Sequence, residues 1–180
     1  MFKNIMILEF LNIVANLKTV SRQGWVDKLA IEKPESVADH TYSMSVMGMI
    51  LSDLENYNTE KVLKMILLHD LAESKIGDLT PGQKSKMEKM ILENNAINDV
   101  FSNLPESIRD QYFEIWNEYQ KNESTEAKFV HQIDKLEMVL QAKIYSKKID
   151  SPEKIISFLE SAKSEISHPN LLNLFKQITS

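Results

Sequence analysis

Four ionisable side chains occur where the helical pattern of this sequence leads us to expect apolar ones. His40 begins a helical stripe with spacings of three and four residues, whose other members are Met44, Met47, Leu51 and Leu54. His69 and Asp70 join the inward face of a second helical segment, and Asp134 lies at the edge of the apolar stripe of a third. A carboxylate inside a protein is costly unless a cation or hydrogen bonds compensate it. Two imidazoles and two carboxylates are a plausible ligand set for one divalent metal, with positions left for water and substrate.

Each of these residues also has an ordinary interpretation. A single histidine on an apolar face is usually a hydrogen-bonded core residue, and an adjacent His-Asp pair is common by chance. Asp134 and Glu137 could form a solvated helix edge. Lys135 or Lys143 would then pair with them. Only the combination of the four residues favours a metal site.

The helical pattern of the whole chain must position these side chains. Only four glycines and five prolines occur, and apolar residues recur at spacings of three and four, so the sequence predicts an all-α protein. We expect a bundle of about six to eight helices in a single domain spanning residues 1–180, since a chain of this length can bury a sufficient core. The predicted helices cover residues 4–18, 38–56, 60–75, 82–101, 105–121, 125–148, 152–165 and 170–178. Residues 21–36 lack periodicity, and a loop of this length is more often functional than idle.

Composition and charge exclude several classes of protein. The chain has no cysteine, which excludes thiol nucleophiles, iron–sulfur clusters, cysteine-bound zinc and disulfide bonds. Its net charge of −5, with both signs intermixed, argues against long nucleic acid as a partner. Charged and amide side chains interrupt residues 1–20, so this segment predicts neither a signal peptide nor a membrane span. We therefore expect a soluble, cytoplasmic protein in which histidines and carboxylates hold any metal.

The order and flanking residues of the ionisable set resemble the HD-domain 5′-deoxynucleotidase family. The segments that match are PESVADH at 34–40, LHDLAE at 68–73 with Gly77-Asp78, and QIDKLEM at 132–138. The resemblance extends from about residue 17 to residue 145, and we expect the C-terminal helices at 152–178 to pack on this core. It implies a helical fold, usually homodimeric, that holds one divalent metal: manganese, cobalt, iron, magnesium or zinc. The implied ligands are His40, His69, Asp70 and Asp134.

The same resemblance implies catalytic roles for Glu73 and Asp78. Glu73 would be the acid/base beside the water that attacks phosphorus, with Asp78 as its partner at the scissile phosphate. The spacing agrees, because Glu73 lies one helical turn beyond His69 and Asp70. Gly77 is suited to end that helix and to turn Asp78 back over the site. The ordinary interpretations are an exposed helix residue for Glu73 and a turn former for Asp78.

The segment SRQGW at residues 21–25 resembles the Arg-x-Gly-Trp loop of the same family. The resemblance implies that Arg22 binds the 5′-phosphate and that Trp25 packs near the sugar. A guanidinium forks onto phosphate oxygens, and an indole offers a flat wall that could crowd a 2′-hydroxyl. In the alternative interpretation, Trp25 fills the core and Arg22 is solvated.

Three further features are interpreted as structural. His131 lies on the same helical face as the ligand of the third segment, but the family motif does not require a histidine there, so we expect local hydrogen bonding instead of metal ligation. His168 precedes a proline at a predicted helix start and is also expected to be structural. Lys84, Lys86 and Lys89 are expected to form a solvated helix face and not a lid over the substrate.

The function that the resemblance implies is metal-dependent hydrolysis of (deoxy)nucleoside 5′-monophosphates, small-molecule substrates that lose their phosphate without a covalent phosphoenzyme. Two alternatives remain open. The first is an HD hydrolase of another phosphoester: a cyclic nucleotide, a nucleoside triphosphate or an alarmone. The second is a non-catalytic helical interaction module stabilised by a metal. Glu73 and Asp78 discriminate against the second alternative, because a purely structural metal site does not need an acidic pair beside its ligands.

Overall fold

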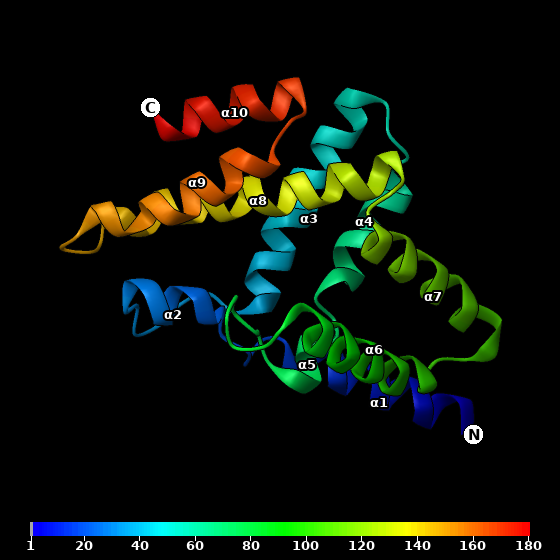
Figure 1. The fold of residues 1–180 in the computed structure, drawn as a ribbon. Coiled ribbons are helices and arrows are strands. Elements are labelled where there is room, and N and C mark those ends of the chain that lie inside the picture. The colour runs from blue at the N-terminus through cyan, green and yellow to red at the C-terminus, as the bar shows by residue number, and fades with distance from the viewer. Residues whose placement is uncertain (1) are drawn as a thin grey trace.

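The computed structural model describes the backbone of residues 2–180 and the side chains of residues 6–180 (Figure 1). Within residues 2–180 the chain is helical, and its only extended contact is an isolated antiparallel bridge between Ser21 and Ser36. The predicted all-α class is confirmed. The elements are α1 (Phe2–Asn16), α2 (Gln23–Leu29), α3 (Val37–Glu55), α4 (Thr59–His69), α5 (Glu73–Ile76), α6 (Lys86–Ser102), α7 (Glu106–Lys121), α8 (Thr125–Ser146), the 3₁₀-helix η1 (Pro152–Ile155), α9 (Ile156–Glu165) and α10 (Pro169–Thr179).

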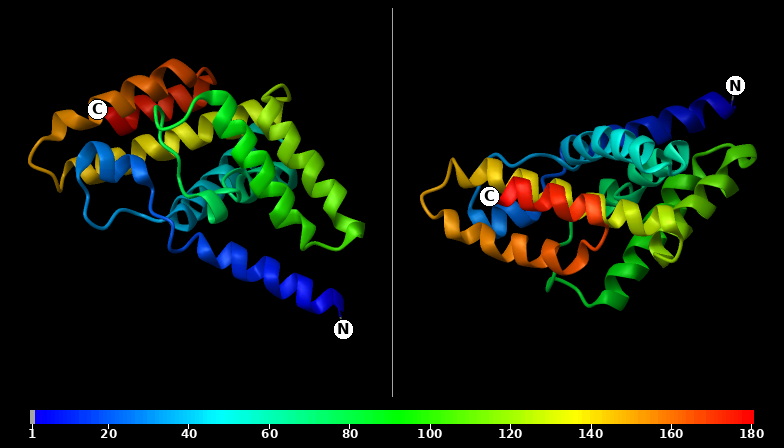
Figure 2. Two further views of the ribbon diagram at one scale, coloured as in Figure 1. Left: turned by 60° about the horizontal axis from the view of Figure 1, so that its bottom comes forward. Right: turned by 90° about the horizontal axis from the view of Figure 1, so that it is seen from above.

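Helix α8 crosses the molecule and organises it. It contacts α3, α4 and α7, and it also packs against η1, α9 and α10. Figure 1 shows α9 and α10 together with α8 at one end of the molecule and α1, α5 and α6 at the other. Two further views in Figure 2 show the N-terminus and C-terminus at opposite ends. Because α3, α4 and α8 meet in the middle, the three helices with unexpected ionisable residues are brought together.

The start of α3 is fixed by a capping box. The Ser36 hydroxyl accepts a hydrogen bond from the backbone N–H of Asp39, and the Asp39 carboxylate accepts one from the backbone N–H of Ser36. This arrangement satisfies two backbone donors at a helix N-terminus that would otherwise lack partners. It also fixes where the helix begins, and therefore which face carries His40 immediately after the cap.

Helices α3 and α4 approach each other closely at Gly48. A Cβ atom at this position would overlap the end of the Ile66 side chain and contact Val62. Glycine permits this approach because it has no side chain to displace its neighbours. The close packing holds α3 against the helix that ends at His69, and it belongs to a buried core that continues through Ile133 of α8.

Three parts of the fold differ from the predicted helices. The predicted helix 60–75 is broken, since α4 ends at His69 and Asp70 has φ −104° and ψ 13°, outside helical geometry. Helix α2 forms inside the segment predicted as a loop. Helix α6 starts at residue 86 and not at 82, because Ser85 provides a capping box after a turn at Gly82, where φ is +97°.

A second, smaller core cluster anchors α2. Trp25 and Leu29 pack with Ala142 and Tyr145 of α8 and with Phe158 of α9. Burial of aromatic and aliphatic side chains at this scale stabilises the attachment of a short helix that could not persist alone. Among the described residues, no helix has both the length and the apolar character needed to cross a membrane.

Candidate functional site

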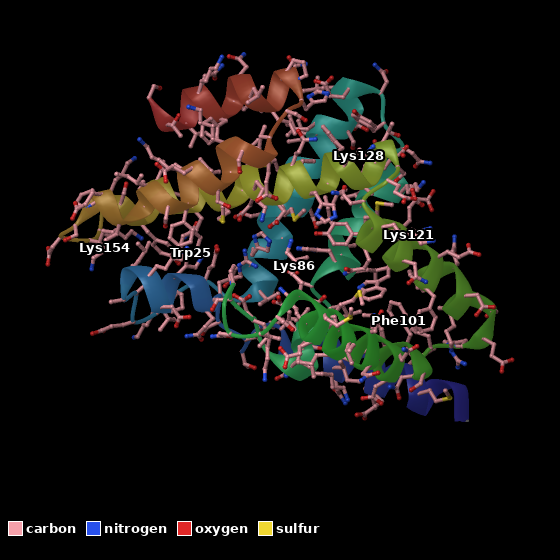
Figure 3. The ribbon with its side chains drawn as sticks, in the orientation of Figure 1. Trp25, Lys86, Phe101, Lys121, Lys128 and Lys154 are labelled. Atoms are coloured by element: carbon pink, nitrogen blue, oxygen red, sulfur yellow. The ribbon has the colours of Figure 1, made fainter. Side chains whose placement is uncertain are left out.

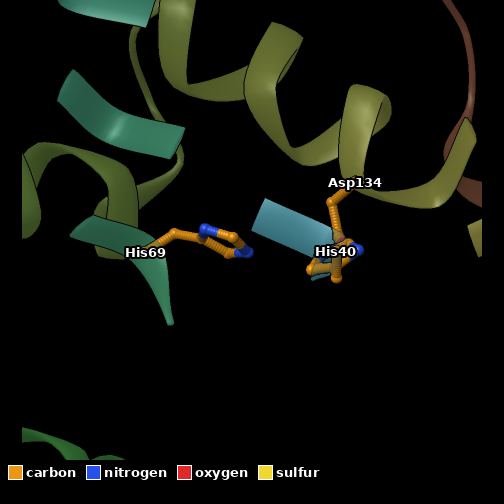
Figure 4. A group of neighbouring side chains, drawn as sticks. All are labelled: His40, His69 and Asp134. Atoms are coloured by element: carbon orange, nitrogen blue, oxygen red, sulfur yellow. The ribbon is translucent and has the colours of Figure 1, made fainter. Parts of the chain in front are cut away.

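His40 lies at the centre of the site and is fully buried. Its Nε2 atom is 3.3 Å from Asp134 Oδ1 and 3.9 Å from Asp70 Oδ2. On the other edge of the ring, Nδ1 lies 2.6 Å from Glu137 Oε2. Figure 4 shows His69 directed toward His40 while Asp134 extends from α8 beside the same ring.

His69 ends α4 with its ring orientation fixed. Its Nδ1 lies 2.6 Å from the backbone oxygen of Ile66, and because a carbonyl only accepts, Nδ1 carries the proton. Nε2 of His69 is then free to act as a ligand atom. It lies 3.0 Å from Asp70 Oδ2 without the alignment of a hydrogen bond.

The donor atoms fit a bound cation. One ligand atom each from His40, His69 and Asp134 lie within 4.8 Å of one another. Both Nε2 atoms are buried and have no hydrogen-bond partner within the described part of the chain. Unpartnered buried polar atoms are costly, and their convergence beside carboxylates is the pattern that a divalent metal would satisfy. Asp70 adds a second carboxylate next to both imidazoles, so the structure brings together all four predicted ligands.

The charges around this point support ionised carboxylates. Burial raises the pKa of Asp70, but the nearby His69 and Arg22 outweigh burial and hold that pKa well below its ordinary value. Burial also opposes ionisation of Asp134, yet its contact with His40 holds the pKa well below the usual range. For His40, burial and Arg22 lower the pKa, but the neighbouring carboxylates raise it to about 9. Both aspartates are therefore charged at neutral pH and ready to bind a cation.

Glu73 is the acidic group next to this set and differs from it electrostatically. It begins α5, is 4% exposed, and its Oε2 atom has no hydrogen-bond partner among the described residues. Burial, followed by the charges of Asp70 and Asp78, raises its pKa well above the ordinary value. A buried carboxyl group with a raised pKa holds a proton more readily than an exposed one, which suits it to acid–base chemistry.

Asp78 lies where the sequence predicts, after a turn at Gly77 with φ +76°. Its Oδ2 accepts a hydrogen bond of 2.7 Å from the backbone N–H of Gln23 at the start of α2. Asp78 therefore connects the loop after α5 to the segment that carries Arg22. Both Asp78 and Arg22 line the same cavity.

Arg22 faces the site instead of the solvent. Its side chain is 16% exposed, and its guanidinium lies 3.4 Å from Asp70 Oδ2. Burial alone would lower the pKa of Arg22, but Asp70 and Asp134 raise it above its ordinary value, so the guanidinium stays charged. The alternative of a solvated Arg22 does not describe this position.

Trp25 combines two of the interpretations drawn from the sequence. It is 2% exposed and packs against Tyr145 and Phe158, with ring centroids 5.4 and 4.6 Å away. Its Nε1 donates a hydrogen bond of 2.9 Å to Glu35 Oε1. Figure 3 shows Trp25 between α2 and the α8–α9 layer. Most of the indole therefore belongs to the second core cluster, and the rest contributes to the cavity wall.

The cavity that adjoins these groups has a volume of about 390 Å³. This volume lies within the range typical of small-molecule sites. The predicted residues on its walls are Arg22, Trp25, His69, Asp70, Glu73, Asp78 and Asp134. Three lysines also line it, namely Lys28, Lys89 and Lys135, so a region rich in carboxylates also carries cationic groups that can attract a phosphate.

The residues interpreted as structural behave mostly as expected. His131 Nε2 donates to the Tyr119 backbone oxygen at 3.0 Å, and the two rings stack 4.1 Å apart, so this nitrogen is already used. His168 occupies the N-cap position of α10 without a side-chain capping bond, and its Nε2 lies 3.6 Å from Glu55. Lys84 and Lys86 are exposed as predicted.

Lys89 is a correction to the predicted solvated face. Its ammonium lies 3.3 Å from the Leu79 backbone oxygen and 3.5 Å from Glu93, and the side chain lines the cavity. The physical reason is the later start of α6, which places Lys89 one turn into the helix, facing the Asp78 loop.

Other cavity and supporting residues were not predicted as site residues. Tyr119 lines the cavity with its ring 5.6 Å from that of His69, and burial raises its pKa well above the ordinary value. No motif in the sequence marked this tyrosine. Glu137 was visible as a carboxylate one turn after Asp134, but the sequence gave no partner for it. Burial, followed by the charge of Glu137, also raises the pKa of Glu35 to about 7.

Comparison with known proteins adds an independent finding. The profile of the HD domain matches residues 14–172. The 5′-deoxynucleotidase HDDC2 of Mus musculus is 39% identical over 173 residues, which cover 96% of this chain and 86% of that protein. The 5′-deoxynucleotidase HDDC2 of Dictyostelium discoideum is 40% identical over 184 residues and 96% of each chain. A crystal structure of a protein from Pyrococcus horikoshii OT3 is similar with a TM-score of 0.79 and 30% identity, covering 95% of this chain and 97% of that one.

Proposed function

The chain belongs to the HD-domain family, and from this premise we propose that it is a metal-dependent phosphohydrolase that releases phosphate from deoxynucleoside 5′-monophosphates. The substrate class comes from the relatives, which are named 5′-deoxynucleotidases. The observation that carries the proposal is the pair of buried Nε2 atoms of His40 and His69, which have no hydrogen-bond partner among the described residues and face two carboxylates at the edge of a cavity. Glu73 and Arg22 adjoin that point and provide the other groups that hydrolysis of a phosphomonoester needs.

The proposed ligands of one divalent metal are His40, His69, Asp70 and Asp134. When bound, such an ion supplies Lewis acidity that polarises a phosphoryl oxygen and lowers the pKa of water. The protein contributes fixed ligand geometry, since the His69 tautomer is set by Ile66 and the aspartates remain ionised. It also contributes a largely buried setting in which charges interact more strongly than in water.

Arg22 is the proposed phosphate-binding residue. A guanidinium can donate two parallel hydrogen bonds to phosphate oxygens, and here it already lies beside a carboxylate at the site. Asp78 supports this role, because its hydrogen bond to the backbone of Gln23 holds the start of α2 next to the cavity. Trp25 also lines the cavity and is proposed to contact the sugar.

Glu73 is the proposed acid/base. Its buried carboxyl group would accept a proton from the attacking water and return a proton to the leaving 5′-oxygen of the sugar, so that neither step releases a free ion into the cavity. Its raised pKa suits both tasks, because such a carboxyl group holds a proton more readily than an ordinary carboxylate. The negative charge of Asp78 contributes to raising the pKa of Glu73. Asp78 is therefore proposed as the partner of Glu73 in proton transfer.

The proposed assembly is a homodimer, as the family resemblance implies. An apolar stripe on the outer face of α3 supports it, formed by the exposed side chains of Tyr42, Val46, Met49, Ile50 and Leu54. Contiguous exposed apolar surface of this kind is typical of association sites. Light scattering should give about twice the chain mass of 20.8 kDa, and the mass of one chain at all concentrations would contradict a dimer.

Phosphate release by the purified, metal-loaded protein tests the proposed function. We expect release from deoxynucleoside 5′-monophosphates and much slower release from di- and triphosphates. Release from a cyclic nucleotide, a triphosphate or an alarmone alone would assign the chain to another HD hydrolase class. No release from any nucleotide, with the metal bound, would favour the non-catalytic module.

The variant Arg22→Ala should raise KM for a monophosphate while the metal content stays the same. Loss of one charge-assisted contact costs about 1.5–3 kcal/mol, which corresponds to roughly a 10–150-fold higher KM. Arg22→Lys is the matched control. It keeps the positive charge but cannot donate two parallel hydrogen bonds, so its KM should lie between those of wild type and Arg22→Ala. Steady-state kinetics with elemental analysis measure both effects, and a wild-type KM in Arg22→Ala would remove this residue from the site.

A further inference from the structure

We propose that Glu137 is a positioning residue for the metal ligand His40, and that Glu35 ties α8, the helix of Glu137, to the segment that carries Arg22 and Trp25. The inference rests on the proposed metal site and goes beyond it, because it concerns what holds the ligand and not the ligand itself. Metal-bound histidines commonly donate their second ring N–H to an acceptor that fixes tautomer and orientation. Here that acceptor is a carboxylate on the same helix as another ligand.

The geometry at His40 carries the first step. Nδ1 lies 2.6 Å from Glu137 Oε2, and both side chains are buried, with 0% and 2% of their residue surfaces exposed. A carboxylate accepts, so Nδ1 donates, and Nε2 is the nitrogen that faces the other ligands and would bind the metal. Nε2 lies 3.3 Å from Asp134, which precedes Glu137 by one turn of α8. A single helix therefore holds the imidazole from both edges.

The two proposed histidine ligands differ in this respect. His69 donates its Nδ1 proton to a neutral backbone oxygen, that of Ile66, whereas His40 donates to a carboxylate. A charged acceptor forms a stronger hydrogen bond and makes the opposite ring nitrogen a better electron donor. Metal affinity should therefore depend on the Glu137 side chain. His69 has no corresponding side-chain acceptor, because its Nδ1 donates to a backbone oxygen.

Glu35 lies beside His40 and Glu137 but forms its own hydrogen bonds. One oxygen of each carboxyl group and one ring nitrogen of His40 lie within 4.8 Å of one another. This cluster has the composition of a metal site, but the atoms that would bind a metal are already used in hydrogen bonds. His40 Nδ1 is used by Glu137, and Glu35 Oε1 accepts from the indole of Trp25 at 2.9 Å.

The backbone of Glu35 completes the connection. Its oxygen accepts a hydrogen bond of 3.0 Å from the backbone N–H of Arg22, and its N–H donates to the hydroxyl of Tyr145 at 2.8 Å. Tyr145 lies on α8, two turns beyond Glu137. The segment proposed to bind phosphate is thus fastened to the helix that positions the proposed metal.

The affinity of metal-free protein for Mn²⁺, measured by calorimetric titration, tests the role of Glu137. Glu137→Met removes the acceptor at similar size, and Glu137→Gln keeps a neutral acceptor. We expect Glu137→Met to weaken Mn²⁺ binding about 10–100-fold, the range for partners of metal ligands, and Glu137→Gln to weaken it less. Saturating Mn²⁺ should then restore most of the turnover in both variants, because Glu137 does not touch the substrate.

Glu126→Gln is the matched control, since it removes one negative charge from the same helix, far from His40. It should bind Mn²⁺ like wild type. Wild-type affinity in a folded Glu137→Met protein would overturn the inference, and if that variant does not fold, wild-type affinity in Glu137→Gln would do so. Failure of the wild-type protein to bind Mn²⁺ would instead contradict the proposed metal site, so the two failures can be told apart.

Discussion

Replacing Glu73 with glutamine should lower turnover about 10²–10⁴-fold, the range that general acid–base groups contribute, while metal content and folding stay close to wild type. The amide has the shape of the carboxyl group but cannot accept and return a proton. No side-chain hydrogen bond of Glu73 to the described residues is lost, because its buried Oε2 has no partner. Turnover with a saturating deoxynucleoside monophosphate, compared with elemental analysis, measures the separation of chemistry from metal binding.

The same variant should alter stability in a direction set by the pKa. The folded state raises the pKa of Glu73, so the stability linked to its protonation is present at low pH and is lost as the pH rises through the folded-state value. Glutamine cannot ionise and avoids this loss. Metal-free Glu73→Gln should therefore melt at or above the wild-type temperature at neutral pH.

A matched control for Glu73 is Glu93→Gln, because Glu93 also lines the cavity but pairs with Lys89 and has no proposed role in the chemistry. Its turnover should stay within a few-fold of wild type. Wild-type turnover in Glu73→Gln would show that Glu73 is not the acid/base. Asp78 would then be the first candidate to examine.

Asp134→Ala should abolish stable metal binding and, with it, hydrolysis. The substitution removes one carboxylate ligand and also the contact at 3.3 Å that faces His40 Nε2. A divalent cation held by fewer ligands loses affinity, and folding that is coupled to binding loses stability as well. Elemental analysis after gel filtration should find little metal in this variant, together with a lower melting temperature than that of metal-loaded wild type.

His131→Ala separates ligation from simple proximity. His131 lies one turn before Asp134 and lines the same cavity, but its Nε2 donates to Tyr119. This variant should keep its full metal content and lose only some stability, since its ring stacks on Tyr119. Full metal in Asp134→Ala, or none in His131→Ala, would contradict the assigned ligand set.

The sequence was most informative where a residue broke a long periodic pattern. His40 and Asp134 lie on helices of 19 and 22 residues, long enough for an apolar stripe to show. The stripe of His40 predicted the buried Met44 correctly but also included Leu54, which is 69% exposed on the outer face of α3. Helix α2 has only seven residues, too few to show a periodic stripe, and it is held by packing against Phe158, which lies far away in the sequence. Likewise, Glu137 could be placed on a helix edge, but its partner His40 lies 97 residues away.

The break after His69 was missed for a different reason. Leu71, Ala72 and Glu73 are all good helix formers, so local propensity predicts that the helix continues. Tertiary contacts prevailed over that preference, as they commonly do. Adjacent residues on a regular helix point about 100° apart, and the irregular turn after His69 brings Asp70 Oδ2 to 3.0 Å from His69 Nε2.

The irregular turn at Asp70 sets local helix stability against the geometry of the proposed site. Substitutions that favour a continuous helix through residues 70–72 would add local stability, which makes them attractive to consensus or thermostability design. They would also swing Asp70 and Glu73 away from the ring of His69 and separate the proposed ligand from the proposed acid/base. Attempts to make this protein more robust should therefore leave the irregular turn unchanged and strengthen the chain elsewhere, for example at the ends of α6 or α10.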